Sequence, residues 1–389
     1  MLRQALRTAV ALLVATLVWL PSLHLFFARN QHDAFVDRGI APRTSELAAR
    51  QIQTLLGGPT SELGAQHQAS GEWDFMGRTY VAWSLANMAL RDPQAKASYL
   101  EKMDKIISET LAVEKDNGFQ YFLLPYWRAR PFVANPPRSI FVDGEIALML
   151  ALRRLVDDNP EDKRALEERV SVITERMSSG PVASAESYPD ECWTFCNAVA
   201  LAALTVSDVL DGTDHSPLAR RWIETAKAKL TDAKTGLLVS RYAYDGTVME
   251  GPEGSTLWMV IHALAVVDPA FARDQYEKAK SELARSILGF GYAAEWPAEA
   301  KGHADIDSGP VIPLLDVSAG SSGLALVAAK TFDDEPYFTK LVTTLDFAAF
   351  PIRERGTLRY AAGNQVGDAV LLYAMALGPA WHEVERRKR

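Results

Sequence analysis

The sequence predicts an all-α protein: an (α/α)6 barrel, or toroid, with short β-hairpins in its loops and an N-terminal transmembrane helix. Two observations predict the barrel. Apolar helices recur along the chain, and each is followed by an amphipathic, charged helix. A helix that is apolar all round is buried, whereas one with a polar stripe faces water. Six buried and five or six exposed helices therefore imply two concentric rings, with a two-domain helical bundle as the alternative.

The N-terminal segment differs from the rest of the chain. Residues 8–28 carry no formal charge, and 21 such residues are enough to cross a bilayer of about 30 Å. A cleaved signal peptide and a buried helix are the alternatives, but no small-x-small cleavage site follows. Arg3 and Arg7 favour a cytoplasmic start, with the globular part periplasmic or extracellular. We expect three parts: a membrane anchor or signal (1–29), a tether and closing outer helix (30–70) and the catalytic barrel (71–380).

The two expected rings follow from the order of the segments. The apolar helices begin near Trp73, Ser139, Asp190, Glu253, Asp305 and Asn364. Their spacing of 51 to 66 residues fits a helical hairpin plus a loop. The charged helices are expected at 93–111, 160–177, 216–230, 269–283 and 336–350, and 45–56 would close the outer ring. Most of them open with Pro at or near the first helical position, where its missing N–H costs nothing. Strand-like pieces at 236–249 and 356–362 predict hairpins in the loops.

Composition limits the classes of partner that the protein can bind. The net charge of −8 argues against nucleic acid, because phosphate binding needs a basic face. Two cysteines cannot build a disulfide scaffold. A small-molecule substrate, the membrane through the N-terminal helix, and a second copy of the chain in a homo-oligomer remain the expected partners.

Carboxylates gather at the expected starts of the inner helices. Parallel inner helices open their N-termini on one face, where exposed N–H groups favour acidic residues. Capping is the alternative for any single residue. Asp143 and Glu145, however, interrupt an apolar run, where an unpaired carboxylate is costly to bury. Asp305 and Asp307 lie in a loop beside His303. Carboxylates in an apolar cavity can have raised pKa values and act as general acids or bases.

Cys192 and Cys196 lie four residues apart at the start of the third apolar helix. A metal site would need more Cys or His at ligand spacing, and a disulfide within one helical turn has poor geometry. Two possibilities remain open: a buried cysteine acting as a small hydrophobe, or a thiol at the cavity. The candidate catalytic residues are therefore Glu145, Asp143, Cys196, Asp305 and Asp307.

Aromatic and polar residues near the same face would line the site. Such a lining suits sugar rings or an apolar ligand, and core packing is the alternative for the aromatic residues. The candidate substrate-binding residues are Trp73, Asp74, Tyr80, Asp190, Cys192, Trp193, Tyr242, Glu253 and Ser255. No metal ligands are assigned.

Residues 188–230 hold a recognisable order of motifs: Pro189-Asp190, then Trp193, the pair Cys196-Asn197, a Gly-Thr-Asp triplet at 212–214, and a helix with Trp222. A Pro-Asp segment with a following aromatic residue, a Cys-Asn pair, a Gly-Thr-Asp triplet and a Trp-containing helix also occur in the linalool dehydratase/isomerase family, which this segment resembles. With "YVAWSLANMALRDP", "FVDGEIALM", "VVDPAF" and "ADIDSGP", the likeness covers about residues 73–377. The resemblance implies an (α/α)6 barrel and acid-base chemistry on a small terpene alcohol, in the periplasm, with no metal or organic cofactor.

The residues that the family uses for catalysis are only partly kept. Its second cysteine corresponds to Cys196, whereas its first aligns with Ser187, which joins the candidate substrate-binding residues. Cys192 is an addition. The family's histidine aligns with Glu145, and its tyrosine falls near Gly254 or Ser255. The scaffold is kept while the acid-base groups differ, so we expect a substrate other than linalool.

The sequence thus predicts an exported, membrane-anchored lyase or isomerase of the hydro-lyase type. Glu145 would be its acid or base, Asp143 a tuning neighbour, and Cys196 a second proton-transfer or contact group. Asp305 and Asp307 would act across the cavity. A glycoside hydrolase or polysaccharide lyase on the same toroid is one alternative, with two carboxylates flanking the sugar bond. A non-catalytic binding protein of the cell envelope is another.

Overall fold

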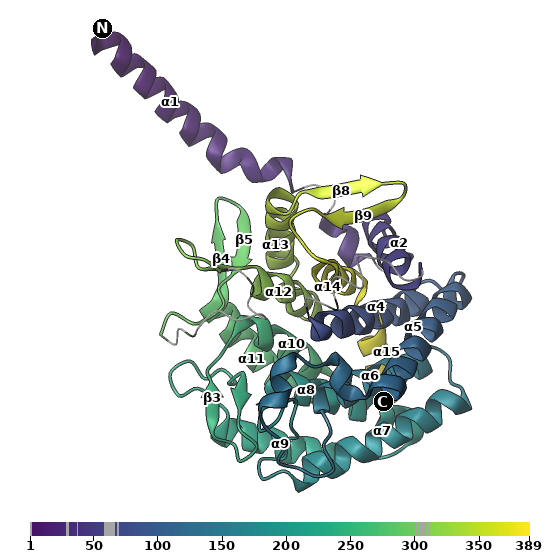
Figure 1. The fold of residues 1–389 in the computed structure, drawn as a ribbon. Helices are drawn as coiled ribbons and strands as arrows, with labels where there is room; N and C mark the ends of the chain where they lie inside the picture. The colour runs from purple at the N-terminus through teal and green to yellow at the C-terminus, as the bar shows by residue number, and fades with distance from the viewer. Residues whose placement is uncertain are drawn as a thin grey trace.

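Six inner helices form a closed ring in the computed structural model, which describes residues 2–28, 31–36, 38–57, 67, 70–299, 302, 309 and 311–389. They are α4 (Gly71–Arg91), α6 (Ile140–Val156), α8 (Thr194–Asp211), α10 (Gly254–Val267), α12 (Ala319–Thr331) and α14 (Gln365–Ala376). Each contacts the next, and α14 contacts α4 (Figure 1). Most of their residues are buried because all sides of each helix are apolar.

The outer ring is made of charged helices that each cover an inner one. They are α5 (Lys96–Asn117), α7 (Pro160–Ser179), α9 (Ser216–Lys229), α11 (Pro269–Leu283), α13 (Glu335–Ala348) and α2 (Pro42–Leu56). α2 contacts α14 and α5 and so fills the sixth outer position. Asn159, Asp268 and Asp334 cap their helices, each followed by Pro in the first turn. The (α/α)6 barrel is confirmed.

One end of the barrel is closed by α15 (Pro379–Lys388). Asn87 Oδ1 accepts from the backbone N–H of Ala380 at 3.0 Å. Arg387 donates to the Leu155 carbonyl at 3.2 Å, and Lys388 donates to the Val266 carbonyl. These carbonyls belong to the last turns of inner helices, where cations are favoured. The C-terminal ends of the ring therefore face α15, and the N-terminal ends form the opposite face, which we call the mouth.

Short antiparallel strands lie in the loops around the mouth. β1 (Cys192–Trp193), β2 (Arg241–Tyr242) and β3 (Val248–Glu250) form one sheet. A second sheet has the order β4 (Ala284–Ile287), β5 (Phe290–Ala293), β7 (Val317–Ser318), β6 (Val311–Ile312). β8 (Pro351–Glu354) and β9 (Thr357–Tyr360) make a third. The 3-10 turns are η1 (Leu23–Phe26), η2 (Gln31–Phe35), η3 (Phe119–Phe122) and η4 (Pro125–Ala129).

Two expectations about these loops need revision. The hairpins at 236–249 and 356–362 are confirmed, but the β4–β5 hairpin was not predicted from the sequence. The fifth inner helix does not begin near Asp305: residues 311–318 form strands and a turn, and α12 begins at Ala319. Ser318 caps it by accepting from the N–H of Ser321. Pro313 and the left-handed Asp316 keep the preceding segment out of the helix.

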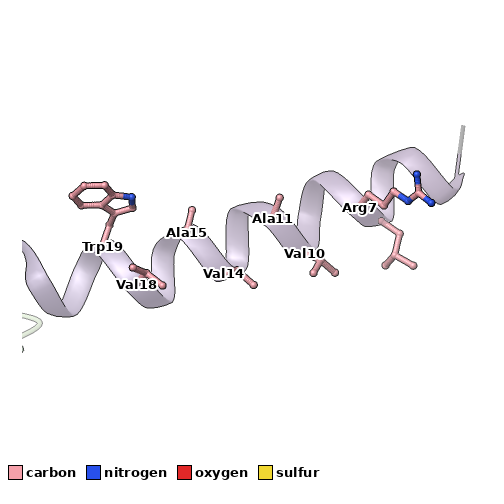
Figure 2. A pocket seen from close by; sticks show the side chains of 8 residues that line it. Arg7, Val10, Ala11, Val14, Ala15, Val18 and Trp19 are labelled. Atoms are coloured by element: carbon pink, nitrogen blue, oxygen red, sulfur yellow. The ribbon is translucent and has the colours of Figure 1, made fainter.

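The N-terminal helix α1 (Leu2–Ser22) projects away from the barrel (Figure 1). Figure 2 shows side chains standing out from this helix, among them Arg7, Val10, Val14, Val18 and Trp19. Within the described residues two helical stretches have the length and hydropathy of a membrane span. The first, Arg3–Phe26, is not buried, whereas the second, Thr194–Asp211, is the core helix α8. The first is compatible with a signal anchor.

Candidate active site

Glu145 lies on α6 and is fully buried near the mouth end of the ring. The neighbouring Gly144 lets α6 approach α8 closely, because a Cβ there would meet the Ala200 Cβ at 3.2 Å. Glu145 Oε2 lies 2.5 Å from Thr79 Oγ1 on α4. Among the residues that the structure describes, its other oxygen, Oε1, has no hydrogen-bond partner. A buried carboxyl oxygen without a partner is rare in folded proteins and marks a position that a ligand or water would satisfy.

Burial raises the pKa of Glu145 to about 8. The hydrogen bond from Thr79 opposes this change, and the nearby charge of Glu72 adds to it. Glu145 is therefore mostly protonated at neutral pH. Thr79 Oγ1 also lies 3.0 Å from the Met76 carbonyl. One hydroxyl proton serves only one of these acceptors, so protonated Glu145 donates to Thr79 while Thr79 donates to Met76. After losing its proton, Glu145 accepts from Thr79 instead.

Tyr80, one residue after Thr79, supplies a second unsatisfied group. Its side chain is fully buried, and its hydroxyl has no hydrogen-bond partner within the described part of the chain. Burial raises the pKa of Tyr80 well above its ordinary value, and the charge of Glu145 raises it further. Its ring lies 5.2 Å from that of Trp83 and 5.7 Å from that of Tyr373. The arrangement presents one carboxyl and one phenol to an aromatic, water-poor interior.

The two cysteines are buried and are not disulfide-bonded to each other. Cys192 pairs with Tyr242 across β1 and β2. Burial, together with the charge of Glu186, raises the pKa of the Cys192 thiol well above its ordinary value, so this thiol does not ionise near neutral pH. Cys196 lies on the first turn of α8, one turn before Ala200 and on the face toward α6. Of the two, Cys196 is on the helix that packs beside Glu145.

An ion-paired cluster surrounds the mouth. Glu191 accepts from Arg130 at 2.9 Å and from Tyr126 at 3.2 Å, and Arg241 also lies 2.9 Å from it. The Arg241 guanidinium sits 5.4 Å from the ring centre of Trp193. These pairings fix the β1–β2–β3 sheet against the loop that carries η4. Trp193 is therefore held at the mouth by its contact with an arginine.

Two glutamates occupy opposite sides of the mouth. Glu72, in the first turn of α4, accepts from the Tyr188 hydroxyl at 2.7 Å. The Tyr188 ring stacks on that of Tyr126 with centres 4.6 Å apart. Glu253, the N-cap residue of α10, lies 3.3 Å from Trp296 Nε1. Helices α4 and α10 are the first and fourth of the six described inner helices, so the two residues lie on opposite sides of the ring.

Ser255 contacts Glu295, a residue that sequence reasoning missed. The Ser255 hydroxyl and N–H donate to Glu295 Oε1 at 2.5 and 3.0 Å, and Ser318 donates to Oε2. Glu295 is almost completely buried. Its position two residues after the apolar strand β5 was the available signal. Thr79 was also missed, since nothing in its sequence context distinguishes it from a packing residue.

The side chains of Asp143 and Glu145 have different neighbours, so the predicted tuning role of Asp143 gains no support from the structure. Residues two apart on a helix point to different faces, and Asp143 points outward, where Arg138 donates to its Oδ2 at 3.0 Å and Arg169 on α7 to its Oδ1. Glu145 points inward to α4. Asp143 is absent from the groups that shift the pKa of Glu145. It belongs to the ion pairs that join α6 to the outer ring.

Other predicted residues are engaged in local structure. Asp74 accepts from Arg78 at 2.9 Å and lies 3.1 Å from the His67 ring. Asp190 is in a left-handed turn and accepts from the N–H of Tyr244 at 3.1 Å. Trp73, in the first turn of α4, donates its backbone N–H to Ser70 Oγ at 3.2 Å.

Ser187 is buried in the loop before β1 and accepts from the N–H of Trp193 at 3.2 Å. Tyr242 is buried, with its hydroxyl 2.7 Å from Ser184 Oγ. Asp305, Asp307 and the neighbouring His303 lie outside the described residues. Among the residues that the structure describes, no three His, Cys, Asp or Glu side chains gather in a way that could hold a metal ion.

The barrel resembles solved carbohydrate-active enzymes at low sequence identity. An inactive variant of an α-1,6-mannanase of Salegentibacter sp. HEL1_6 superposes with a TM-score of 0.55 and 14% identity, covering 86% of this chain and 98% of that one. The unsaturated glucuronyl hydrolase of Bacillus sp. GL1 gives a TM-score of 0.54 and 10% identity, with 89% and 96% covered. These likenesses concern the fold alone.

The family comparison rests on sequence. No curated protein matches the chain. Residues 162–366, from α7 to the start of α14, match the family described as linalool dehydratase/isomerase. The matched range holds Cys196, Tyr242, Glu253 and the helices α8, α10 and α12, and it is more than half of the 389 residues. The chain belongs to the linalool dehydratase/isomerase family.

Proposed function

We propose that the protein is a cofactor-independent lyase or isomerase that acts on an alcohol by general acid-base catalysis. The observation that carries this proposal is Glu145, a fully buried carboxyl with a pKa of about 8 and one oxygen without a partner. A group that holds its proton at neutral pH in a water-poor site can deliver it to a leaving group. The family match supports the scaffold.

In this mechanism protonated Glu145 donates its proton to the hydroxyl of the substrate. The carbon–oxygen bond breaks, water leaves, and a neighbouring carbon loses a proton to complete the alkene. Return of that proton to Glu145, directly or through Cys196, restores the resting state. The Thr79 hydroxyl reverses its hydrogen bond and stabilises the carboxylate formed in between. The unpartnered Tyr80 hydroxyl would hold the substrate oxygen or the departing water.

The substrate class follows from the walls around these groups. Trp83, Tyr80 and Tyr373 pack against each other near Glu145, and such a lining favours an apolar carbon skeleton. Terpenoid alcohols fit this description. Since Glu145 stands where the family has a histidine, a substrate other than linalool remains our expectation. Asp305 and Asp307 stay predictions as groups acting across the cavity.

A glycan-active enzyme is the second candidate, favoured by Glu72 and Glu253 on opposite sides of the mouth. Glycoside hydrolysis uses two carboxylates that flank the scissile bond, and the stacked Tyr126 and Tyr188 rings beside Glu72 would suit a sugar. The structural neighbours support this candidate through their fold. Glu145 would have no role in such a reaction.

The test is a product screen with the purified full-length chain in detergent. One arm offers terpenoid alcohols and follows alkene formation, and the other offers envelope oligosaccharides and follows new reducing ends. The proposal expects turnover in the first arm that Glu145→Gln abolishes and Asp143→Asn retains per folded molecule. Turnover confined to the second arm, lost in Glu72→Gln and unaffected by Glu145→Gln, would refute it.

A further inference from the structure

Exposed apolar side chains surround the point where α1 meets the barrel. We name six of them the anchor-side patch: Leu25, Phe26, Ile287, Leu288, Phe347 and Phe350. They come from η1, the turn of the β4–β5 hairpin, the end of α13 and the residue before β8. Phe350 is 64% exposed and Leu25 is 61% exposed. A contiguous apolar patch of this kind marks an interaction site in a soluble domain.

The patch is continuous with the end of α1. The His24 ring lies 6.2 Å from that of Phe290, and the Phe27 ring lies 5.2 Å from that of Phe347. Phe290 and Phe347 are themselves 5.0 Å apart. The ring contacts fix the position where the chain leaves α1, and Figure 1 shows the β4–β5 hairpin, α13 and β8 around that base. Whatever surface α1 enters is therefore next to the patch.

Two residues of the patch adopt a backbone conformation that bulky side chains avoid. Leu288 has φ 50° and Phe350 has φ 54°. Positive φ is a genuine outlier for large residues. Leu288-Gly289 forms a two-residue hairpin turn in which both φ values are positive, a place where Asn-Gly is the favoured pair. The similar turn of β8–β9 carries Arg355-Gly356. Leu288 is 40% exposed, so packing covers only part of its side chain. A backbone outlier of this kind at the surface points to a use outside the fold.

The patch also lies on the mouth side of the barrel. The β4–β5 hairpin connects α11 with the strand and loop segment before α12, and α12 starts at the mouth like the other inner helices. β8–β9 likewise joins α13 to the start of α14. An object that covers the patch would consequently lie beside the rim of the mouth. The α15 end of the barrel faces the other way.

We propose that the anchor-side patch rests on a phospholipid bilayer, with Leu288 and Phe350 inserted at the level of the headgroups. The occupant follows from α1: an unburied apolar helix of span length ends beside the patch. Apolar side chains at an interface add buried area to an existing anchor. Docking brings the rim of the mouth to the membrane surface, where an apolar substrate would be concentrated. The membrane contact itself does not depend on the reaction.

The test places a single environment-sensitive fluorophore on the full-length chain reconstituted in phospholipid vesicles. Both native cysteines are buried, so an added surface cysteine is labelled selectively and the unaltered chain gives the background. Leu288→Cys reports on the patch, Val14→Cys on α1 and Arg386→Cys on the exposed surface of α15. We expect blue-shifted emission and strong quenching by lipid-borne quenchers at 14 and 288, and neither at 386.

Three outcomes would overturn the proposal. Emission at 288 equal to that at 386 would leave the patch in water. A blue shift at 288 without lipid quenching would mean that a second copy of the chain covers it. Absence of lipid quenching at 14 would remove the anchor on which the orientation rests.

A variant separates docking from folding. Leu288→Asn places at the left-handed position a residue that favours it, so thermal unfolding should be unchanged or shifted upward. With the label at Ile287→Cys, the added Leu288→Asn and Phe350→Asn changes should lower lipid quenching several-fold. Undiminished quenching in this stably folded variant would contradict the proposal.

Discussion

Glu145 and His262 are both buried ionisable groups of the inner ring, yet they are treated differently by their surroundings. His262 lies toward the end closed by α15, with Nδ1 2.6 Å from Thr331 Oγ1 and Nε2 2.7 Å from the Tyr373 hydroxyl. Thr331 gives its own proton to the Val327 carbonyl. His262 Nδ1–H therefore donates to Thr331, and Nε2 accepts from Tyr373. Every polar atom of this ring is used.

Glu145, at the mouth end, leaves one oxygen without a partner. Burial lowers the pKa of His262 to about 3 and raises that of Glu145 to about 8. Both groups are thus neutral at pH 7, but only Glu145 changes its charge near that pH. The difference supports the proposal that Glu145 acts as the acid, because a satisfied buried network stabilises the fold while an unsatisfied group costs free energy.

The largest effect should come from Glu145→Gln. The amide keeps the shape but cannot deliver a proton, so turnover of the substrate found by the screen should fall by roughly 10²- to 10⁴-fold. Steady-state rates measured on protein with unchanged circular dichroism check this. A rate within twofold of the parent would show that the acid is elsewhere. His262→Gln is the control. The protein that remains folded in this variant should show the same dependence of turnover on pH as the parent.

Glu145→Gln should also change the pH dependence of stability. The folded pKa of about 8 is above the ordinary value of 4.5. The parent's stability from the bound proton is therefore complete below about pH 4.5 and is lost as pH rises through 8. Between these pH values, denaturant unfolding should show the unfolding free energy of the variant rising relative to that of the parent, by about 5 kcal/mol at the alkaline end. A constant difference would contradict the raised pKa.

Asp143 offers the matched comparison on the same helix. Asp143→Asn should cost about 2 kcal/mol of unfolding free energy, because Arg138 and Arg169 lose one of their two carboxylate partners and keep only Glu114. At pH 7 we expect Asp143→Asn to be less stable than the parent and Glu145→Gln to be more stable. The denaturant midpoints of the two variants check this. Loss of turnover per folded molecule in Asp143→Asn would show that Asp143 takes part in the reaction.

The comparison of these two carboxylates also shows how far the sequence leads. The alternation of apolar and charged helices was sufficient to predict the barrel, because the residues of a helix determine whether it is buried. The apolar run around Glu145 also identified this carboxylate as costly to bury. It did not reveal that Asp143 points to Arg169 on the outer ring, or that Thr79 on α4 meets Glu145. Both contacts join segments far apart in sequence, and their partners depend on how the helices are rotated.

The start of the fifth inner helix was predicted wrongly for a related reason. Its expected start near Asp305 came from the apolar residues within 305–327, but β7 in this stretch pairs with β5, and β6 pairs with β7. A short apolar run is compatible with a strand or with a buried helix, and only the partner decides.

The smallest effect is expected from Thr79→Val. The hydroxyl favours the ionised form of Glu145, so its removal should raise the pKa of Glu145 by about one unit. Because the proposed acid acts in its protonated form, the alkaline limb of the pH–rate profile should move to higher pH by the same amount. Thr110→Val on the outer helix α5, whose buried hydroxyl bonds only its own helix at 2.7 Å, is the control and should leave the limb in place.

The protonation state of Glu145 can be measured without knowing the substrate. Carbon-13 NMR of protein labelled at the glutamate carboxyl, compared with Glu145→Gln, identifies its resonance by subtraction. A titration of that resonance with a midpoint near pH 8 is the predicted result. A midpoint near 4, the value of a carboxyl in water, would contradict the assignment of Glu145 as the acid.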